Sequence, residues 1–249
     1  MTFTSLGGRE DVLELNGTND SDIFNVNQTA DQIQIVRATT AFVTVALNTT
    51  GINTLDLRGL DGDDTFNLAA VLPYVGGVLV DAGNPSASDT LNLTGATGAI
   101  VENLAAQTVT GYGATVSFLG TEHVNLAGAG GAATLTINAS TGDDQLAYTP
   151  TGASAGTVTR AGQNVVTNFS GIAGTFTLDA LAGSDTVTVN GTSLGDAVAV
   201  FTTKRSPAPE LEFDPPPCTF KKLGPPVPDT VTVSLPLPAL TTSESVLAE

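Results

Sequence analysis

A short phrase of strand, turn and strand recurs along this chain of 249 residues and constrains the fold more than any other feature. Each clear copy is fourteen residues long and has an aspartate at its tenth position. Units of this kind cannot bury an apolar face alone, so they stack, and a stack lines up the carboxylates that its turns carry. The clear copies are LELNGTNDSDIFNV (13–26), LDLRGLDGDDTFNL (55–68), LTINASTGDDQLAY (135–148), FTLDALAGSDTVTV (176–189) and VTVNGTSLGDAVAV (187–200).

Weaker copies and further apolar runs fill the gaps between these phrases. Residues 78–93 contain two extra residues but keep Asp89, and residues 124–137 have Ala133 in place of the aspartate. Neighbouring strands start about 11 residues apart, which predicts about eighteen short strands between Leu13 and Val200. The strands expected between the copies are 33–36, 43–46, 115–118, 157–159 and 165–168.

The repetition predicts an all-β fold. Turns of equal length, and strands that successive copies share, imply translation along one axis, so we expect a right-handed parallel β-helix, or β-solenoid, over residues 1–201. Regular short strands also suit an antiparallel β-sandwich, which is the alternative. Ten of the thirteen prolines lie in residues 202–249, which are therefore expected to form a proline-rich linker or disordered tail. The fragment DTVTV (229–233) echoes the repeat within that tail.

Alternation in the second strand of each copy predicts its buried face. Phe66 and Leu68 share one face and are expected inside, while Thr65 and Asn67 share the other. The equivalent asparagines of stacked copies, Asn25, Asn67 and Asn92, should then form a ladder on the outside. Glycine recurs at the fifth position of the phrase, where a left-handed turn is expected. These glycines are Gly17, Gly59, Gly128 and Gly191.

Charge narrows the classes of partner. Residues 1–201 contain nineteen Asp or Glu, four Arg and no Lys. Phosphate recognition needs clustered Lys and Arg, so nucleic acid is not an expected partner. An anionic membrane surface would repel this chain, and no apolar run is long enough for membrane insertion. The surface instead favours divalent cations or a salt-rich medium.

The tenth-position aspartate stands two residues before an inward apolar residue. In GLDGDDTFN (59–67), Gly59, Gly62, Asp64 and Phe66 resemble GGxGxDxUx, the calcium-binding nonapeptide of repeats-in-toxin (RTX) proteins. The resemblance covers about half of residues 11–200, and the motifs here are isolated rather than in tandem. It implies calcium bound by turn carboxylates and backbone carbonyls, with Asp64 as the first candidate ligand, followed by Asp144, Asp22 and Asp185. Asp61, Asp63 and Asp143 lie in the same turns and add the several oxygen ligands that calcium prefers.

These aspartates have a second interpretation, because Asp also caps turns by accepting bonds from backbone N–H groups. Capping is the preferred interpretation for Asp89 and Asp196, which have fewer acids beside them. Catalysis is not expected. No acids group outside the repeated turns, and His123 has no Ser or Cys partner pattern. A polysaccharide lyase or glycoside hydrolase is the minor alternative.

The sequence therefore predicts a calcium-stabilised structural or adhesive repeat segment of a secreted or cell-surface protein. The opening residues lack the layout of a secretion signal, so export uses another route or the chain is a piece of a larger protein. The alternative is a polysaccharide-binding or polysaccharide-degrading β-helix, which needs a groove with clustered acids and aromatics on one face. A third hypothesis is an acidic surface adapted to salt, with no specific ligand.

Overall fold

The computed structural model describes residues 11–37, 39–47, 51–85 and 88–191. It also describes the backbone of the short strands at residues 201–205, 208–213, 218–222 and 230–234. Every regular element in these ranges is a strand, so the all-β prediction is confirmed. Within the same ranges no helix is long and apolar enough to cross a membrane.

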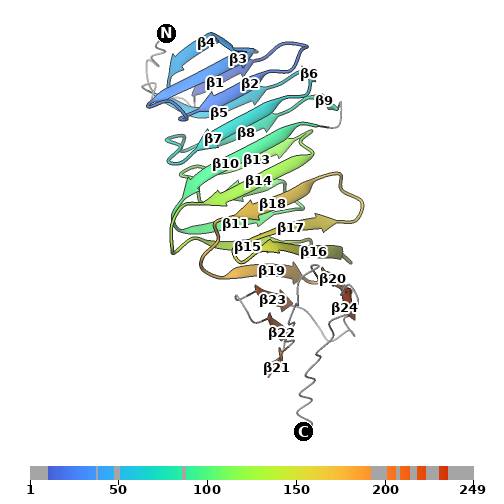
Figure 1. The fold of residues 1–249 in the computed structure, drawn as a ribbon. Helices are drawn as coiled ribbons and strands as arrows, with labels where there is room; N and C mark the ends of the chain where they lie inside the picture. The colour runs from blue at the N-terminus through green and yellow to red at the C-terminus, as the bar shows by residue number, and fades with distance from the viewer. Residues whose placement is uncertain are drawn as a thin grey trace.

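Two open sheets of eleven strands carry the fold, and the chain passes repeatedly from one to the other (Figure 1). In neighbour order, sheet A contains β1 (Asp11–Asn16), β5 (Ile52–Arg58), β8 (Gly77–Asp81), β13 (Val116–Leu119), β12 (Thr108–Thr110), β11 (Ala99–Asn103), β15 (Thr134–Asn138), β19 (Phe176–Leu181), β23 (Cys218–Lys222), β22 (Ala208–Phe213) and β21 (Phe201–Arg205). Sheet B contains β24 (Thr230–Ser234), β20 (Thr186–Asn190), β16 (Gln145–Gly152), β17 (Ala155–Arg160), β18 (Val166–Ser170), β14 (His123–Gly128), β10 (Thr90–Ala96), β7 (Thr65–Ala69), β2 (Ile23–Val26), β3 (Gln32–Arg37) and β4 (Thr40–Ala46). The short strands β6 (Asp61–Gly62) and β9 (Asn84–Pro85) pair separately.

The direction of pairing depends on how the strands are connected. Strands that follow a crossover from the other sheet lie parallel to their equivalents in neighbouring copies, as in the series β2, β7, β10 and β14. Strand β18, which follows a hairpin from β17, also lies parallel to β14. Antiparallel pairs occur within four three-stranded meanders, β2–β4, β11–β13, β16–β18 and β21–β23, where short turns return the chain to the same sheet. The sheets are therefore mixed, and they differ from both a purely parallel helix and a purely antiparallel sandwich.

The core lies between the two sheets and follows the alternation of the repeat. Phe66 and Leu68 are completely buried, as are their equivalents on β2 and β10. The rings of Phe24 and Phe66 stack with their centroids 4.6 Å apart, because parallel register places identical positions side by side. Burial of each such side chain contributes about 2 kcal/mol. The predicted inward face is confirmed.

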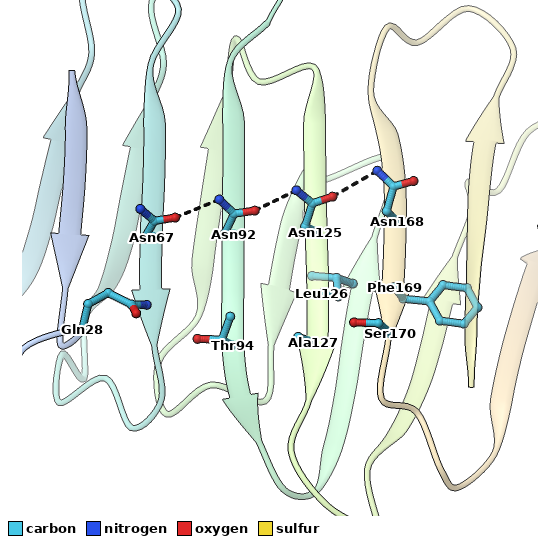
Figure 2. A pocket seen from close by; sticks show the side chains of 10 residues that line it. All are labelled: Gln28, Asn67, Asn92, Thr94, Asn125, Leu126, Ala127, Asn168, Phe169 and Ser170. Carbon is cyan, nitrogen blue, oxygen red and sulfur yellow. Dashed lines mark hydrogen bonds between the residues drawn. The ribbon is translucent and has the colours of Figure 1, made fainter. Parts of the chain in front are cut away.

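The outward asparagines of sheet B form the predicted ladder, and it is longer than expected (Figure 2). The side-chain amide of Asn67 donates to Asn25 over 2.9 Å, and Asn92 donates to Asn67 over 2.8 Å. Asn125 and Asn168 continue the series with bonds of 2.7 and 3.0 Å. One row of amides therefore crosses five neighbouring strands of sheet B.

Strands β21 to β24 lie in the part of the chain that the sequence assigned to a proline-rich tail. The backbone of β23 pairs parallel with β19, and that of β24 pairs parallel with β20. β24 overlaps the echo of the repeat at residues 229–233. The domain boundary near residue 201 stays a prediction.

Candidate functional site

The repeated aspartates come together along one edge of sheet B. Parallel register aligns Ile23, Thr65, Thr90 and His123, so the residues just before them also align. Gln145 and Thr186 align in the same way farther along the sheet. Because β16 and β18 are both antiparallel to β17, all these strands begin at the same edge. We call the aligned acids the acid column: Asp22, Asp64, Asp89, Glu122, Asp144 and Asp185.

Carboxylates of the acid column accept hydrogen bonds from the backbone of the neighbouring coil. Asp22 N–H donates to Asp64 Oδ1 over 2.7 Å, and Asp64 N–H donates to Asp89 Oδ1 over 2.7 Å. Asp89 N–H donates to Glu122 Oε2 over 2.9 Å, and Asp144 N–H donates to Asp185 Oδ1 over 3.0 Å. These amides stand at the corners of buried turns, where an unpaired N–H is costly. Bonds to an ionised acceptor are the stronger kind.

Two carboxylates also close their own turns. Asp22 Oδ2 accepts from the backbone N–H and the hydroxyl of Thr18, over 2.6 and 2.8 Å. Asp144 Oδ2 accepts the equivalent pair from Ser140, over 2.8 and 2.9 Å. Contacts of this kind are those expected of turn-capping aspartates.

Each of these two aspartates also pairs with an arginine from the adjacent meander. Arg37 Nε, at the end of β3, lies 3.5 Å from Asp22 Oδ1. Arg160, at the end of β17, forms an ion pair with Asp144 and donates to Ser140 Oγ over 2.9 Å. These meanders therefore bring a positive charge to the column, a role that the scattered arginines did not suggest in the sequence.

The other predicted ligands lie outside the buried column. Asp61 is exposed and accepts a bond of 3.0 Å from Asn84 Nδ2. Asp63 is exposed and its N–H donates to Ser21 Oγ over 3.1 Å. Asp143 is exposed and accepts from Ser184 N–H over 2.7 Å. Asp196 lies outside the described residues.

The geometry of the acids bears on how calcium could be held. Within the described residues no three side chains of His, Cys, Asp or Glu come close enough together to hold a metal ion. Calcium takes six to eight oxygen ligands, whereas the column offers about one carboxylate per coil with an oxygen already bonded to N–H. The side chains therefore do not fit a closed calcium cage, and calcium stays a prediction.

The fifth-position glycines serve a different purpose from the predicted one. Gly17, Gly59 and Gly128 do not adopt a positive φ, so the left-handed turn expected at these positions is wrong. Gly191 lies at the end of the described residues, and the turn expected there stays a prediction. A Cβ at Gly59 would collide with the Asp64 carboxylate and come within 2.5 Å of the Ala82 carbonyl oxygen. A Cβ at Gly17 would lie 2.9 Å from Asp22 Oδ2. At these two positions glycine makes room for the aspartate that folds back against the turn.

Burial changes the acidity of the middle of the column. Burial raises the pKa of Asp64 to about 6. The hydrogen bond from the Asp22 N–H favours the ionised form and opposes this rise, whereas the negative charges of Asp89, Asp22 and Asp63 add to it. Burial also raises the pKa of Asp89 to about 6, aided by the charge of Glu122. The Oδ2 atoms of Asp64 and Asp89 have no hydrogen-bond partner in the described part of the chain. The Oδ2 atom of each carboxyl group can therefore carry the proton while its Oδ1 atom continues to accept the hydrogen bond from the backbone N–H.

A further buried acid, Glu102, lies in the core between the sheets and was not predicted from the sequence. Glu102 on β11 is completely buried and accepts a bond of 2.8 Å from the hydroxyl of Thr167 on β18, across the two sheets. Burial raises the pKa of Glu102 to about 7. The sequence did contain a sign of this pair, because Glu102 and Thr167 occupy positions that the alternation of their strands assigns to the buried face. Glu122 was also not predicted, because a glutamate stands there in place of the aspartate that precedes the second strand in the clear copies.

The chain was compared with models of known protein families, with curated proteins and with solved structures, and none of these comparisons gives a match. The resemblance to RTX repeats therefore depends on the motif residues alone.

We predict that Gly59→Ala destabilises the protein by about 3 kcal/mol or more, because the added methyl group meets the Asp64 carboxylate and the Ala82 carbonyl. Chemical denaturation measures the change. Gly131→Ala is the matched control, since a Cβ there has nothing within 4 Å. Equal stability of the two variants would contradict the assigned role of Gly59.

We predict that stability falls as pH rises from 5 to 8. The raised pKa of Asp64 and Asp89 means that the folded state binds protons more tightly than the unfolded chain, and this stabilisation is lost as pH passes about 6. Glu102 acts in the same direction near pH 7. The expected loss is on the order of 1–3 kcal/mol per group, measured by urea unfolding.

Two variants assign the pH effect. Asp64→Asn keeps an oxygen acceptor without the charge and should reduce the difference between pH 5 and pH 8. Asp61→Asn, in the same turn but exposed and not among the charges that act on Asp64 or Asp89, should leave the difference unchanged. Greater stability of the wild type at pH 8 than at pH 5 would show that these groups are not protonated as described.

Proposed function

We propose that this chain is a structural segment built by stacking of repeated coils, a solenoid-type arrangement, in a secreted or cell-surface protein. It serves as a spacer or adhesive module. The observation that carries the proposal is the parallel register of successive copies, in which Ile23, Thr65, Thr90 and His123 are neighbours and the acid column precedes them. In such a stack each coil is stabilised chiefly by its neighbours, so length can change by whole coils.

The proposal excludes catalysis, and the disposition of the acids supports this. Glycoside hydrolysis needs two carboxyl groups that face a substrate across a set separation. The five aspartates of the column are buried, and carboxylates of the column accept backbone N–H bonds. His123 stands on the outer face of sheet B in a row with Thr90 and Val166. Its neighbours along the sheet therefore offer it no acidic partner.

We predict that one complete coil can be deleted. Removal of residues 65–89 joins Asp64 to Thr90 and takes out β7 from sheet B and β8 from sheet A. Thr65 and Thr90 are register partners, as are Leu55 and Val78, so the neighbouring coils can close in register. The shortened protein should remain soluble, give a β-type circular dichroism spectrum and unfold in one cooperative transition.

Deletion of residues 65–76 is the control, because it removes β7 and leaves β8. The chain then has two successive strands for sheet A with no crossover through sheet B. This variant should lose the cooperative transition. If both deletions unfold the protein to the same extent, the coils are not the units of assembly and the proposal fails.

Calcium stabilisation is the competing proposal for the acid column. Because the Oδ1 atoms already accept N–H bonds, the melting temperature should be the same with calcium and with a chelator at equal ionic strength. Thermal melts followed by circular dichroism measure this. A rise of several degrees with calcium, absent in Asp61→Asn/Asp63→Asn and retained in Asp81→Asn on sheet A, would favour calcium at the turns.

A further inference from the structure

The outer face of sheet B differs in charge from the rest of the protein. The formal net charge of the chain is -17. On β2, β7, β10, β14, β18, β16 and β20, however, the outward positions hold Asn, Thr, Gln, Ser, Ala, Ile, Val and one His, with no Asp, Glu, Lys or Arg. Sheet A carries Glu14, Asp56, Arg58 and Asp81 on its outward face. The described part of the chain therefore has one uncharged polar face.

A hollow lies on this face beside the asparagine ladder (Figure 2). Its volume is about 420 Å³, and it extends from Gln28 across β7, β10 and β14 to Ser170 on β18. The next outward row consists of small residues, Ala69, Thr94, Ala127 and Ser170, while the adjacent row consists of asparagines. The hollow is therefore elongated along the stacking direction, over roughly 15 Å at strand spacings of about 4.8 Å.

The ladder leaves hydrogen-bonding capacity along the wall of the hollow. An asparagine amide has two N–H donors and an oxygen with two lone pairs. Within the ladder Asn92 donates once, to Asn67, and accepts once, from Asn125. Beyond the ladder bonds, one donor and one acceptor site of the amide thus remain on each strand. Asn67, Asn92 and Asn125 are only partly buried, so a ligand can reach these sites. Such a row repeats the same mixed pattern at each strand.

We propose that this hollow binds an extended neutral polysaccharide along the stacking direction. Sugar hydroxyls both donate and accept, which matches the amides and hydroxyls of the hollow, and a chain of sugars repeats as the ladder does. The uncharged face suits an uncharged ligand, and the surrounding acids repel an anionic polymer. A second copy of the same face fits less well, because two facing hollows leave a void. This site goes beyond the proposed structural role and differs from the groove of acids and aromatics expected from the sequence.

The test uses the full chain and defined glycans. Oligosaccharides of glucose, of mannose and of N-acetylglucosamine are titrated by calorimetry, with oligogalacturonate as the anionic probe. We expect binding of at least one neutral oligosaccharide and none of oligogalacturonate. Thr94→Glu and Ala127→Glu place a bulky charge in the hollow and should weaken binding at least tenfold. Thr136→Glu, at an outward position of sheet A, should bind as the wild type does, and thermal melts verify that each variant is folded.

Three outcomes would overturn the proposal. Thr94→Glu and Ala127→Glu could bind as tightly as the wild type, which would place the glycan elsewhere. Oligogalacturonate alone could bind. Finally, the titrations could show no glycan binding while sedimentation shows self-association that Thr94→Glu abolishes. That result would identify a second copy of the chain as the occupant of the hollow. None of these results affects the coil-deletion test, so failure here is distinguishable from failure of the structural proposal.

Discussion

The fold depends on how the backbone is satisfied at the corners where the chain turns into sheet B. A corner amide lies outside the strand ladder, yet it is buried, and a buried N–H without an acceptor costs about 1–3 kcal/mol. The carboxylate of the next coil supplies that acceptor at Asp22, Asp64, Asp89 and Asp144. A carboxylate side chain, aspartate or glutamate, thus joins coil to coil at the place where sheet pairing cannot.

This constraint explains several other features of the chain. The carboxylate must fold back against its own turn, so Gly17 and Gly59 leave space for it. Stacked acids repel one another, and at Asp22 and Asp144 an arginine from a meander relieves this. At Asp64 and Asp89, burial and neighbouring charge instead raise the pKa. The acids of the column lie at the edge of sheet B and not on its outer face, where uncharged residues, chiefly asparagine and threonine, stand.

The sequence predicted the parts of this arrangement that recur with the period of the phrase. Alternation identified Phe66 and Leu68 as inward and Asn67 as outward, and the tenth-position aspartates were expected on one edge. The sequence did not predict how the segments between the copies are arranged. The meanders are antiparallel hairpins whose residues do not repeat, so Arg37 and Arg160 gave no signal. Asn125, Asn168 and Glu122 lie outside the clear copies, so the sequence did not assign them to these rows, although their register places them there.

The exchange rate of the corner amides tests most directly whether the acid column joins the coils. Hydrogen exchange followed by NMR would report on Asp22, Asp64, Asp89 and Asp144, whose N–H groups donate to carboxylates rather than to strand carbonyls. We expect protection comparable with that of amides inside β7 and β10. Exchange as fast as at the exposed turn residue Asp20 would contradict this role, because the corner amides would then be open to water and the carboxylates would not hold one coil to the next.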